Sequence, residues 1–70
     1  MKKVLSIAGS DCSGGAGIQA DLKTFSAHGV FGMSVIVSVV AENTSRVIDI
    51  QDITTDMIAK QIDEIGRAHV

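Results

Sequence analysis

The chain of 70 residues has few of the side chains that stabilise small domains: one cysteine, Cys12, no tryptophan and no tyrosine. A single cysteine excludes an internal disulfide, and no cysteine–histidine cluster has the spacing of a zinc site. Domains of this size usually need a disulfide, a bound metal or a partner for stability. The aromatic residues are Phe25 and Phe31 alone, so the apolar fraction of 46% is mainly aliphatic. This composition predicts elements that are buried on both faces.

The sequence also lacks a basic patch and a long apolar run. Its net charge of −2 argues against nucleic acid as a main partner. The apolar run after Lys3 ends at Gly9, too early for the core of a secretory signal. Residues 33–41 contain Ser34 and Ser38 and are too short to span a bilayer. We therefore expect a cytoplasmic protein with neither a nucleic-acid partner nor a membrane partner.

The hydrophobic pattern predicts strands that alternate with helices. Residues 4–8 and 34–41 are continuous apolar runs, typical of buried strands, and residues 47–53 predict a short strand that is partly exposed. Apolar residues spaced three or four apart predict two helices. Ile18, Leu22 and Phe25 mark the first, and Ile58, Ile62 and Ile65 mark the second.

Local signals support these helices. Gly29 follows the first, where glycine readily adopts a left-handed cap. Thr54 or Thr55 can cap the second, with Asp56 in its first turn. The order β-α-β-β-α indicates an α/β layered fold. Two or three strands cannot cover both faces of their own sheet, so we expect residues 1–63 to be the amino-terminal fragment of a larger domain.

The last seven residues, 64–70, correspond to one translated frame of a common sequencing adapter. Gly66 interrupts the helical pattern there, and we therefore predict a non-native tail that starts after Asp63. The alternative is a genuine helix end at Gly66.

A glycine-rich turn, residues 9–17, lies between the first strand and the first helix. Ligands of α/β folds bind at this end of the strands, and the start of the helix offers free backbone N–H groups. Two phosphate motifs fail, however. Gly9 and Gly14 have the Walker A spacing, but Gly15 and Ala16 stand where lysine and serine or threonine belong. The Gly-x-Gly-x-x-Gly pattern is absent too, so the turn is either a ligand site of another kind or only a tight connection.

Residues 7–25, from Ile7-Ala8-Gly9-Ser10-Asp11 to Lys23-Thr24-Phe25, closely resemble the opening of the hydroxymethylpyrimidine/phosphomethylpyrimidine kinases of thiamine biosynthesis. Gly32-Met33-Ser34-Val35-Ile36 and Asn43-Thr44 extend the likeness, which covers residues 2–63 without a gap. The resemblance implies the amino-terminal portion of a ribokinase-like three-layer α/β/α sandwich.

The resemblance further implies an enzyme that uses ATP and Mg²⁺ to phosphorylate 4-amino-5-hydroxymethyl-2-methylpyrimidine and then its monophosphate. Gly9 and Ala16 match positions whose backbone packs on the pyrimidine, and Asp21 matches a carboxylate that faces the substrate. The alternative for Asp21 is a solvated helix residue. The ATP site and the catalytic base come from a later Gly-Thr-Gly-Cys-type segment, so this fragment has no catalytic residue and is expected to be inactive by itself.

Glu42 matches a position that is glutamine in many members of the family. An amide offers one donor and one acceptor to the edge of an aminopyrimidine, whereas a carboxylate only accepts. Either the pyrimidine binds protonated, or Glu42 binds protonated, or the contact differs. Our hypothesis is that Glu42 touches the ring and that glutamate retunes recognition.

Two other functions stay open. Some pyridoxine/pyridoxal kinases share this turn, and Glu42 does not separate them from the pyrimidine enzymes, although Asn43-Thr44 favours the latter. A non-catalytic small-molecule-binding fragment would have to fold alone, with exposed strand edges. The resemblance also implies a homodimer for the full-length protein.

Overall fold

The computed structural model describes residues 1–69, and the side chains of residues 1–67. It contains β1 (Lys3–Asp11), α1 (Gly17–Ala27), β2 (Phe31–Glu42), β3 (Val47–Asp52) and α2 (Thr55–His69). The predicted order β-α-β-β-α is therefore confirmed.

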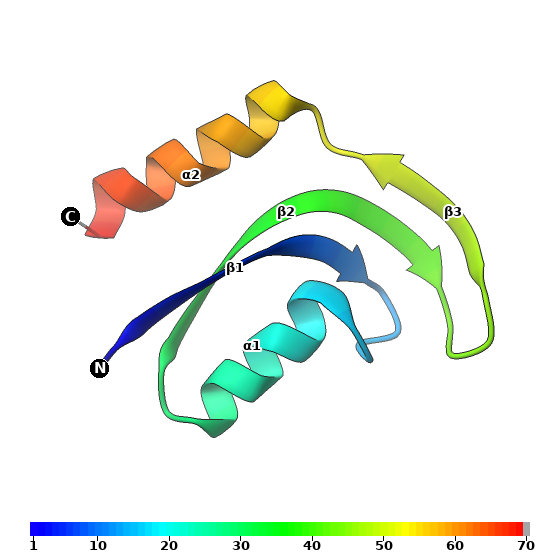
Figure 1. The fold of residues 1–70 in the computed structure, drawn as a ribbon, viewed down its shortest axis with the longest axis horizontal. Helices are drawn as coiled ribbons and strands as arrows, with labels where there is room; N and C mark the ends of the chain where they lie inside the picture. Colours follow the sequence, from blue (N-terminus) through cyan, green and yellow to red (C-terminus); the bar gives the residue numbers. More distant parts are fainter. Residues whose placement is uncertain (70) are drawn as a thin grey trace.

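The strands form one sheet in the order β1-β2-β3. β1 and β2 are parallel and joined through α1, whereas β2 and β3 form an antiparallel hairpin. Figure 1 shows α1 on one side of the strands and α2 on the other. The arrangement is thus a narrow α/β/α stack, in which α1 is the crossover helix of the parallel pair.

Helix α1 covers both β1 and β2. A Cβ on Gly32 would lie 3.0 Å from side-chain atoms of both Leu22 and Phe25, so glycine at this point of β2 lets the helix approach closely. Ile18 of α1 is 4% exposed and Val35 of β2 is 0% exposed. These two are the buried apolar residues among the described side chains, and they lie on opposite faces of the sheet, because Gly32 faces α1 and Val35 is three residues further along β2.

A bulge in β2 changes which face its side chains occupy. Ala8 pairs with Ile36, but Ser10 pairs with Val39, so β2 carries one extra residue opposite Gly9. Because side chains alternate along a strand, one extra residue moves all later side chains of β2 to the opposite face. The bulge therefore sets the orientation of the end of β2.

The β2–β3 hairpin extends beyond the cover of the helices. All six residues of β3 are exposed, more than the partly exposed strand that the sequence predicts. In the turn, Asn43 Oδ1 accepts hydrogen bonds from the backbone N–H groups of Ser45 at 2.8 Å and Arg46 at 3.1 Å. The hairpin is held by its own ladder and turn, with little packing against other elements.

Helix α2 begins as predicted, and the side chain of Gln61 joins it to β2. Thr54 Oγ1 accepts a hydrogen bond from the Met57 N–H at 3.2 Å, so Thr54 rather than Thr55 is the cap. Gln61 Oε1 accepts from the Ile36 N–H at 2.9 Å, and Gln61 Nε2 donates to the Ile36 carbonyl at 2.8 Å. The amide of Gln61 thus pairs with the free edge of β2 as a neighbouring strand would.

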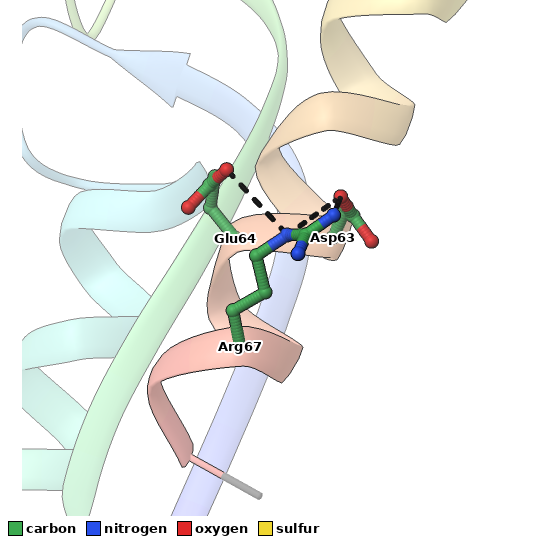
Figure 2. Close-up of polar contacts among 3 residues, drawn as sticks. All are labelled: Asp63, Glu64 and Arg67. Atoms are coloured by element: carbon green, nitrogen blue, oxygen red, sulfur yellow. Dashed lines mark hydrogen bonds and ion pairs between the residues drawn. The ribbon is translucent and has the colours of Figure 1, made fainter.

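The predicted interruption of the helix at Gly66 is not found, because α2 continues through that residue to His69. Figure 2 shows the guanidinium of Arg67 between two carboxylates, 3.0 Å from Asp63 and 3.8 Å from Glu64. Any helix with these residues four and three positions apart can form such pairs. These ion pairs are consistent with a continuous α2. They do not test the predicted non-native origin of residues 64–70, of which Val70 lies outside the described residues.

The surface of the structure is large for its mass. Its accessible area is 4862 Å², against about 4,200 Å² expected for a folded monomer of this mass. The radius of gyration of the Cα atoms is 13.0 Å, where a compact chain of this length has about 11 Å. Leu5 and Ile7 of β1 and Phe31 of β2 are 38%, 56% and 46% exposed on the face opposite α1. The predicted incomplete cover of the sheet is therefore observed.

None of the helices in residues 1–69 combines the length and the apolar content that crossing a membrane requires.

Candidate functional site

Asp11 organises the glycine-rich turn at the end of β1. It is 4% exposed, and its Oδ1 accepts hydrogen bonds from the Ser13 N–H at 2.9 Å and the Ser13 hydroxyl at 2.7 Å. Its Oδ2 accepts from the Gly15 N–H at 3.1 Å. The carboxylate therefore occupies backbone donors that a bound anion would otherwise take.

The turn is also closed by a contact between glycines. Gly17, the first residue of α1, has φ of +59°, and a Cβ on it would collide with the carbonyl oxygen of Gly9. A Cβ on Gly9 would in turn lie 2.6 Å from Ser38 Oγ. These glycines are thus needed for close packing of the turn on β2, in addition to any contact of Gly9 with a ligand. Ala16 precedes α1 in extended conformation and is exposed.

Polar side chains fasten α1 to β1. The Ser6 hydroxyl donates to Asp21 Oδ2 at 2.6 Å, and Gln19 Nε2 donates to Ser10 Oγ at 2.8 Å. Gln19 Oε1 also accepts from the Asp11 N–H at 2.8 Å. Asp21 is therefore not a solvated residue on the outer face of α1, as the alternative interpretation had it. Its hydrogen bond joins it to the buried Ser6.

Glu42, the last residue of β2, reaches the same face of the sheet as Asp11. Asp11 pairs with Val40, and Glu42 is two residues further along β2, on the same side of the strand. Such diagonal neighbours lie within reach of long side chains. Each of the two carboxyl groups accordingly acts on the pKa of the other. The Cys12 thiol fixes this end of β2: its Sγ donates to the Glu42 carbonyl oxygen at 3.1 Å and accepts from the Glu42 N–H at 3.4 Å.

The pKa values of the two carboxyl groups are shifted in opposite directions. The hydrogen bond from the Ser13 hydroxyl is the largest cause that lowers the pKa of Asp11, and the Ser13 N–H, Glu42 and the Ala16 N–H lower it further. Burial is the largest cause that raises the pKa of Glu42, followed by repulsion from Asp11 and the hydrogen bond to it. Asp11 is thus the anion of the pair, and Glu42 is the member that more readily holds a proton.

The described contacts bring the predicted site residues together only in part. Glu42 meets Asp11, which the sequence analysis had not selected, whereas Asp21 meets Ser6 within residues 1–69. The Asp11-x-Ser13 spacing was the available signal, because an aspartate often accepts from the N–H two residues on. Lys23 Nζ donates to the Gly14 carbonyl at 3.1 Å, so this side chain of α1 lies against the turn.

Two other features of the described residues bear on ligands. No group of three histidine, cysteine, aspartate or glutamate side chains among them could hold a metal ion. A shallow hollow lies on the hairpin, lined by Val39, Ala41, Asp49 and Gln51. Val39 and Ala41 alternate with Glu42 along β2, so this hollow is on the opposite face from the carboxyl pair and is not the candidate site.

The turn does not fit the phosphates of a nucleotide. The N–H groups of Ser13 and Gly15 already bind the Asp11 carboxylate, whose negative charge would repel a phosphate. Lys23, the cation beside the turn, is engaged with Gly14. The backbone donors of Ser13 and Gly15 are therefore taken by Asp11, and no Walker lysine stands in the turn beside them.

A strand–turn–helix unit, a parallel strand and a hairpin at its end make an α/β unit whose solved structural neighbours are kinases of ribokinase-like fold. The structure matches the crystal structure of phosphomethylpyrimidine kinase from Clostridium difficile 630 with a TM-score of 0.94 and 52% identity, over 99% of this chain and 30% of that one. It matches the pyridoxal kinase from Staphylococcus aureus in complex with AMP-PCP and pyridoxal with a TM-score of 0.85 and 39% identity, over 97% of this chain and 26% of that one.

The sequence model of the phosphomethylpyrimidine kinase family matches residues 11–68. The chain belongs to this family. It is 56% identical over 61 residues to the hydroxymethylpyrimidine/phosphomethylpyrimidine kinase of Rhizobium meliloti, a match that covers 87% of this chain and 23% of the relative. The chain therefore spans about a quarter of the length of the curated relatives that it matches.

Proposed function

We propose that residues 1–63 form the part of an ATP-dependent kinase that binds the alcohol substrate, 4-amino-5-hydroxymethyl-2-methylpyrimidine or its monophosphate. Membership of the phosphomethylpyrimidine kinase family supports the reaction. The occupied N–H groups of the glycine-rich turn support the assignment of this segment to the substrate rather than to the nucleotide.

The single observation that carries the proposal is the position of Glu42. It stands at the carboxyl end of β2, beside the end of β1 and the turn, where ligands of α/β sheets bind. Gly9 and Ala16 present backbone near this edge, and Asp21 is held on α1 by Ser6. We assign the ring to Gly9, Ala16 and Glu42 and the substrate hydroxyl to Asp21. ATP, Mg²⁺ and the catalytic base belong to other parts of such an enzyme, which acts in the cytoplasm as a homodimer.

A second candidate is a pyridoxal kinase. The Staphylococcus aureus pyridoxal kinase shares the fold of this segment with a TM-score of 0.85. Its identity to this chain is 39%, below the 52% of the Clostridium difficile phosphomethylpyrimidine kinase. The pyrimidine substrate is therefore the better supported of the two. A binding module that functions alone is disfavoured by the exposed apolar face of β1 and β2.

A chimeric kinase tests the proposal directly. Residues 1–63 of this chain replace the aligned segment of the Clostridium difficile kinase, which supplies the rest of the enzyme. We expect phosphorylation of the hydroxymethylpyrimidine with ATP and Mg²⁺, and a lower kcat/KM on pyridoxal. A chimera that unfolds cooperatively but phosphorylates neither alcohol, while the parent kinase is active, contradicts the proposal; a preference for pyridoxal selects the second candidate.

A further inference from the structure

Glu42 lies beside Asp11 and is the acidic residue proposed to contact the ring of an aminopyrimidine. Such a ring presents an amine donor next to an acceptor nitrogen, and a protein group must offer both an acceptor and a donor to satisfy that edge. A carboxylate offers only acceptors. A neutral carboxylic acid offers one O–H donor and one C=O acceptor, as an amide does.

The geometry at the strand ends favours a neutral acid at one of the two positions. Two carboxyl groups at diagonal positions of neighbouring strands repel each other when both are ionised, so ionisation of the second group is disfavoured. Asp11 is 4% exposed and accepts three hydrogen bonds from Ser13 and Gly15, all of which favour its ionised form. When the pair takes up one proton, Glu42 is therefore the group that holds it.

The groups around Glu42 do not relieve this repulsion. From β1 and the turn, Asp11 faces it as an anion and Cys12 contacts its backbone. From α1, the Lys23 ammonium is bound to the Gly14 carbonyl. From the hairpin, Arg46 is exposed, and its N–H donates to Asn43. Asp11 is the charged group that acts on the acidity of Glu42.

We propose that Glu42, beside the ionised Asp11, takes up one proton when an amino-substituted nitrogen heterocycle binds, and that it meets the ring as a neutral carboxylic acid. Glu42 then donates to the ring nitrogen and accepts from the exocyclic amine, which reproduces the hydrogen bonding of an amide. Asp11 is a positioning residue that does not touch the ring. This inference rests on the proposed contact of Glu42 with the substrate, and it selects the protonated-glutamate alternative.

The placement depends on the bulge in β2. Without the extra residue opposite Gly9, the alternation of β2 would turn Glu42 toward the face that α1 covers, away from Asp11. Ser38, in the bulge, lies so close to Gly9 that a Cβ there would be 2.6 Å from its Oγ. The packing of the glycine-rich turn and the protonation of Glu42 thus depend on the same local distortion.

Proton uptake on binding tests the inference. Calorimetric titration of the chimeric kinase with 4-amino-5-hydroxymethyl-2-methylpyrimidine, without ATP, is carried out in buffers of different ionisation enthalpy. The pH is kept above that at which the free ring loses its own proton. We expect uptake of close to one proton from the buffer, and a Kd that rises about tenfold for each pH unit at the alkaline end. The ultraviolet spectrum of the bound ring should remain that of the neutral form.

Three variants separate the role of Glu42, which takes up the proton, from that of Asp11, which positions it. Glu42→Gln should bind without proton uptake and with a Kd independent of pH, while the exposed Asp52→Asn on β3 should retain the uptake and the slope of the parent chimera. Asp11→Asn should move the rise in Kd to lower pH, a shift that loss of packing alone would not produce. If Asp11→Asn does not fold, the comparison of Glu42→Gln with Asp52→Asn decides.

The outcomes distinguish this inference from the proposed function. Binding without proton uptake, or a bound ring with the spectrum of the protonated form, overturns the neutral glutamic acid and leaves the kinase assignment intact. A folded chimera that neither binds nor phosphorylates the pyrimidine overturns both.

Discussion

Residues 3–42 and residues 47–69 are held together in different ways. In the first region, α1 packs over β1 and β2, and hydrogen bonds of Ser6 and Gln19 with the two elements lock them together. The second region consists of β3, which is exposed along its whole length, and α2, which docks on β2 through Gln61.

The two regions therefore differ in burial, and the candidate site lies in the more buried one. The first region contains the buried residues Ile18 and Val35, the glycine-rich turn and the carboxyl pair. The second region carries apolar side chains that remain largely exposed within residues 1–69. Ile48, for example, is 64% exposed. Substitutions in the first region should therefore affect stability strongly, and those in the second weakly, when both are measured in the chimeric kinase.

The largest effect is expected for Gly17→Ala. The left-handed φ of +59° and the overlap of a Cβ with the Gly9 carbonyl should together destabilise the fold by about 2–4 kcal/mol. Urea denaturation of the chimera measures the loss. Gly15→Ala is the matched control in the same turn, since its Cβ would lie 3.8 Å from the nearest atom, Asp11 Oδ2. Equal stabilities of the two variants would refute the steric explanation.

Next in size is Val35→Ala at the centre of β2. Removing two methyl groups from a residue that is 0% exposed should cost about 2 kcal/mol through lost burial and a residual cavity. The matched change Ile48→Ala on β3 should stay within about 0.5 kcal/mol of the unmodified chimera. A cost for Ile48→Ala as large as that for Val35→Ala would show that the remainder of the enzyme buries β3.

Gln61→Ala should have an intermediate effect, because it leaves the N–H and carbonyl of Ile36 without their side-chain partners. The expected loss is about 1–2 kcal/mol in the free energy of unfolding, and faster amide hydrogen exchange at Ile36. Lys60→Ala, which removes only the exposed ion pair with Asp56 one turn away, should cost about 0.3 kcal/mol. Unchanged exchange at Ile36 would mean that water or another segment replaces the amide.

The smallest effect on stability is expected from the carboxyl pair, and its sign depends on pH. The lowered pKa of Asp11 contributes stability that is present above its ordinary value of 3.8 and is lost as the pH falls through the lowered value. The raised pKa of Glu42 contributes stability that is present below its ordinary value of 4.5 and is lost as the pH rises through the raised value.

Glu42→Gln should therefore remove the decline on the alkaline side and leave the one on the acid side. Stability curves of the chimera and this variant, measured by urea denaturation from acid to neutral pH, show the difference directly. Parallel curves would mean that the two carboxyl groups titrate independently.

Much of the fold could be predicted from local patterns. The strands and helices were found from apolar spacing, Gly29 indeed takes a left-handed φ of +69° after α1, and Thr54 caps α2. The helical spacing of Ile58, Ile62 and Ile65 outweighed Gly66, which α2 includes. Glycine in a helix costs about 1 kcal/mol relative to alanine and does not by itself end it.

The candidate site was predictable only in part. Glu42 was selected because its acidity conflicts with the amide expected from the family. Asp11 was missed, because its role depends on a pairing with β2 that spans thirty-one positions of sequence, from residue 11 to residue 42. Asp21 was selected from the family resemblance, and its partner in the structure, Ser6, followed only from the packing of α1 on β1. Its predicted contact with the substrate, like those of Gly9, Ala16 and Glu42, stays a prediction.

The sequence alone determined the elements, their order and the incomplete cover of the sheet, because helix and strand periods and end caps are properties of neighbouring residues. The tertiary structure decided which groups meet. A single extra residue in β2 reverses the side on which Glu42 stands and brings it to Asp11. Register across a sheet depends on the packing of both strands and the helix between them, so the propensities of single segments do not determine it.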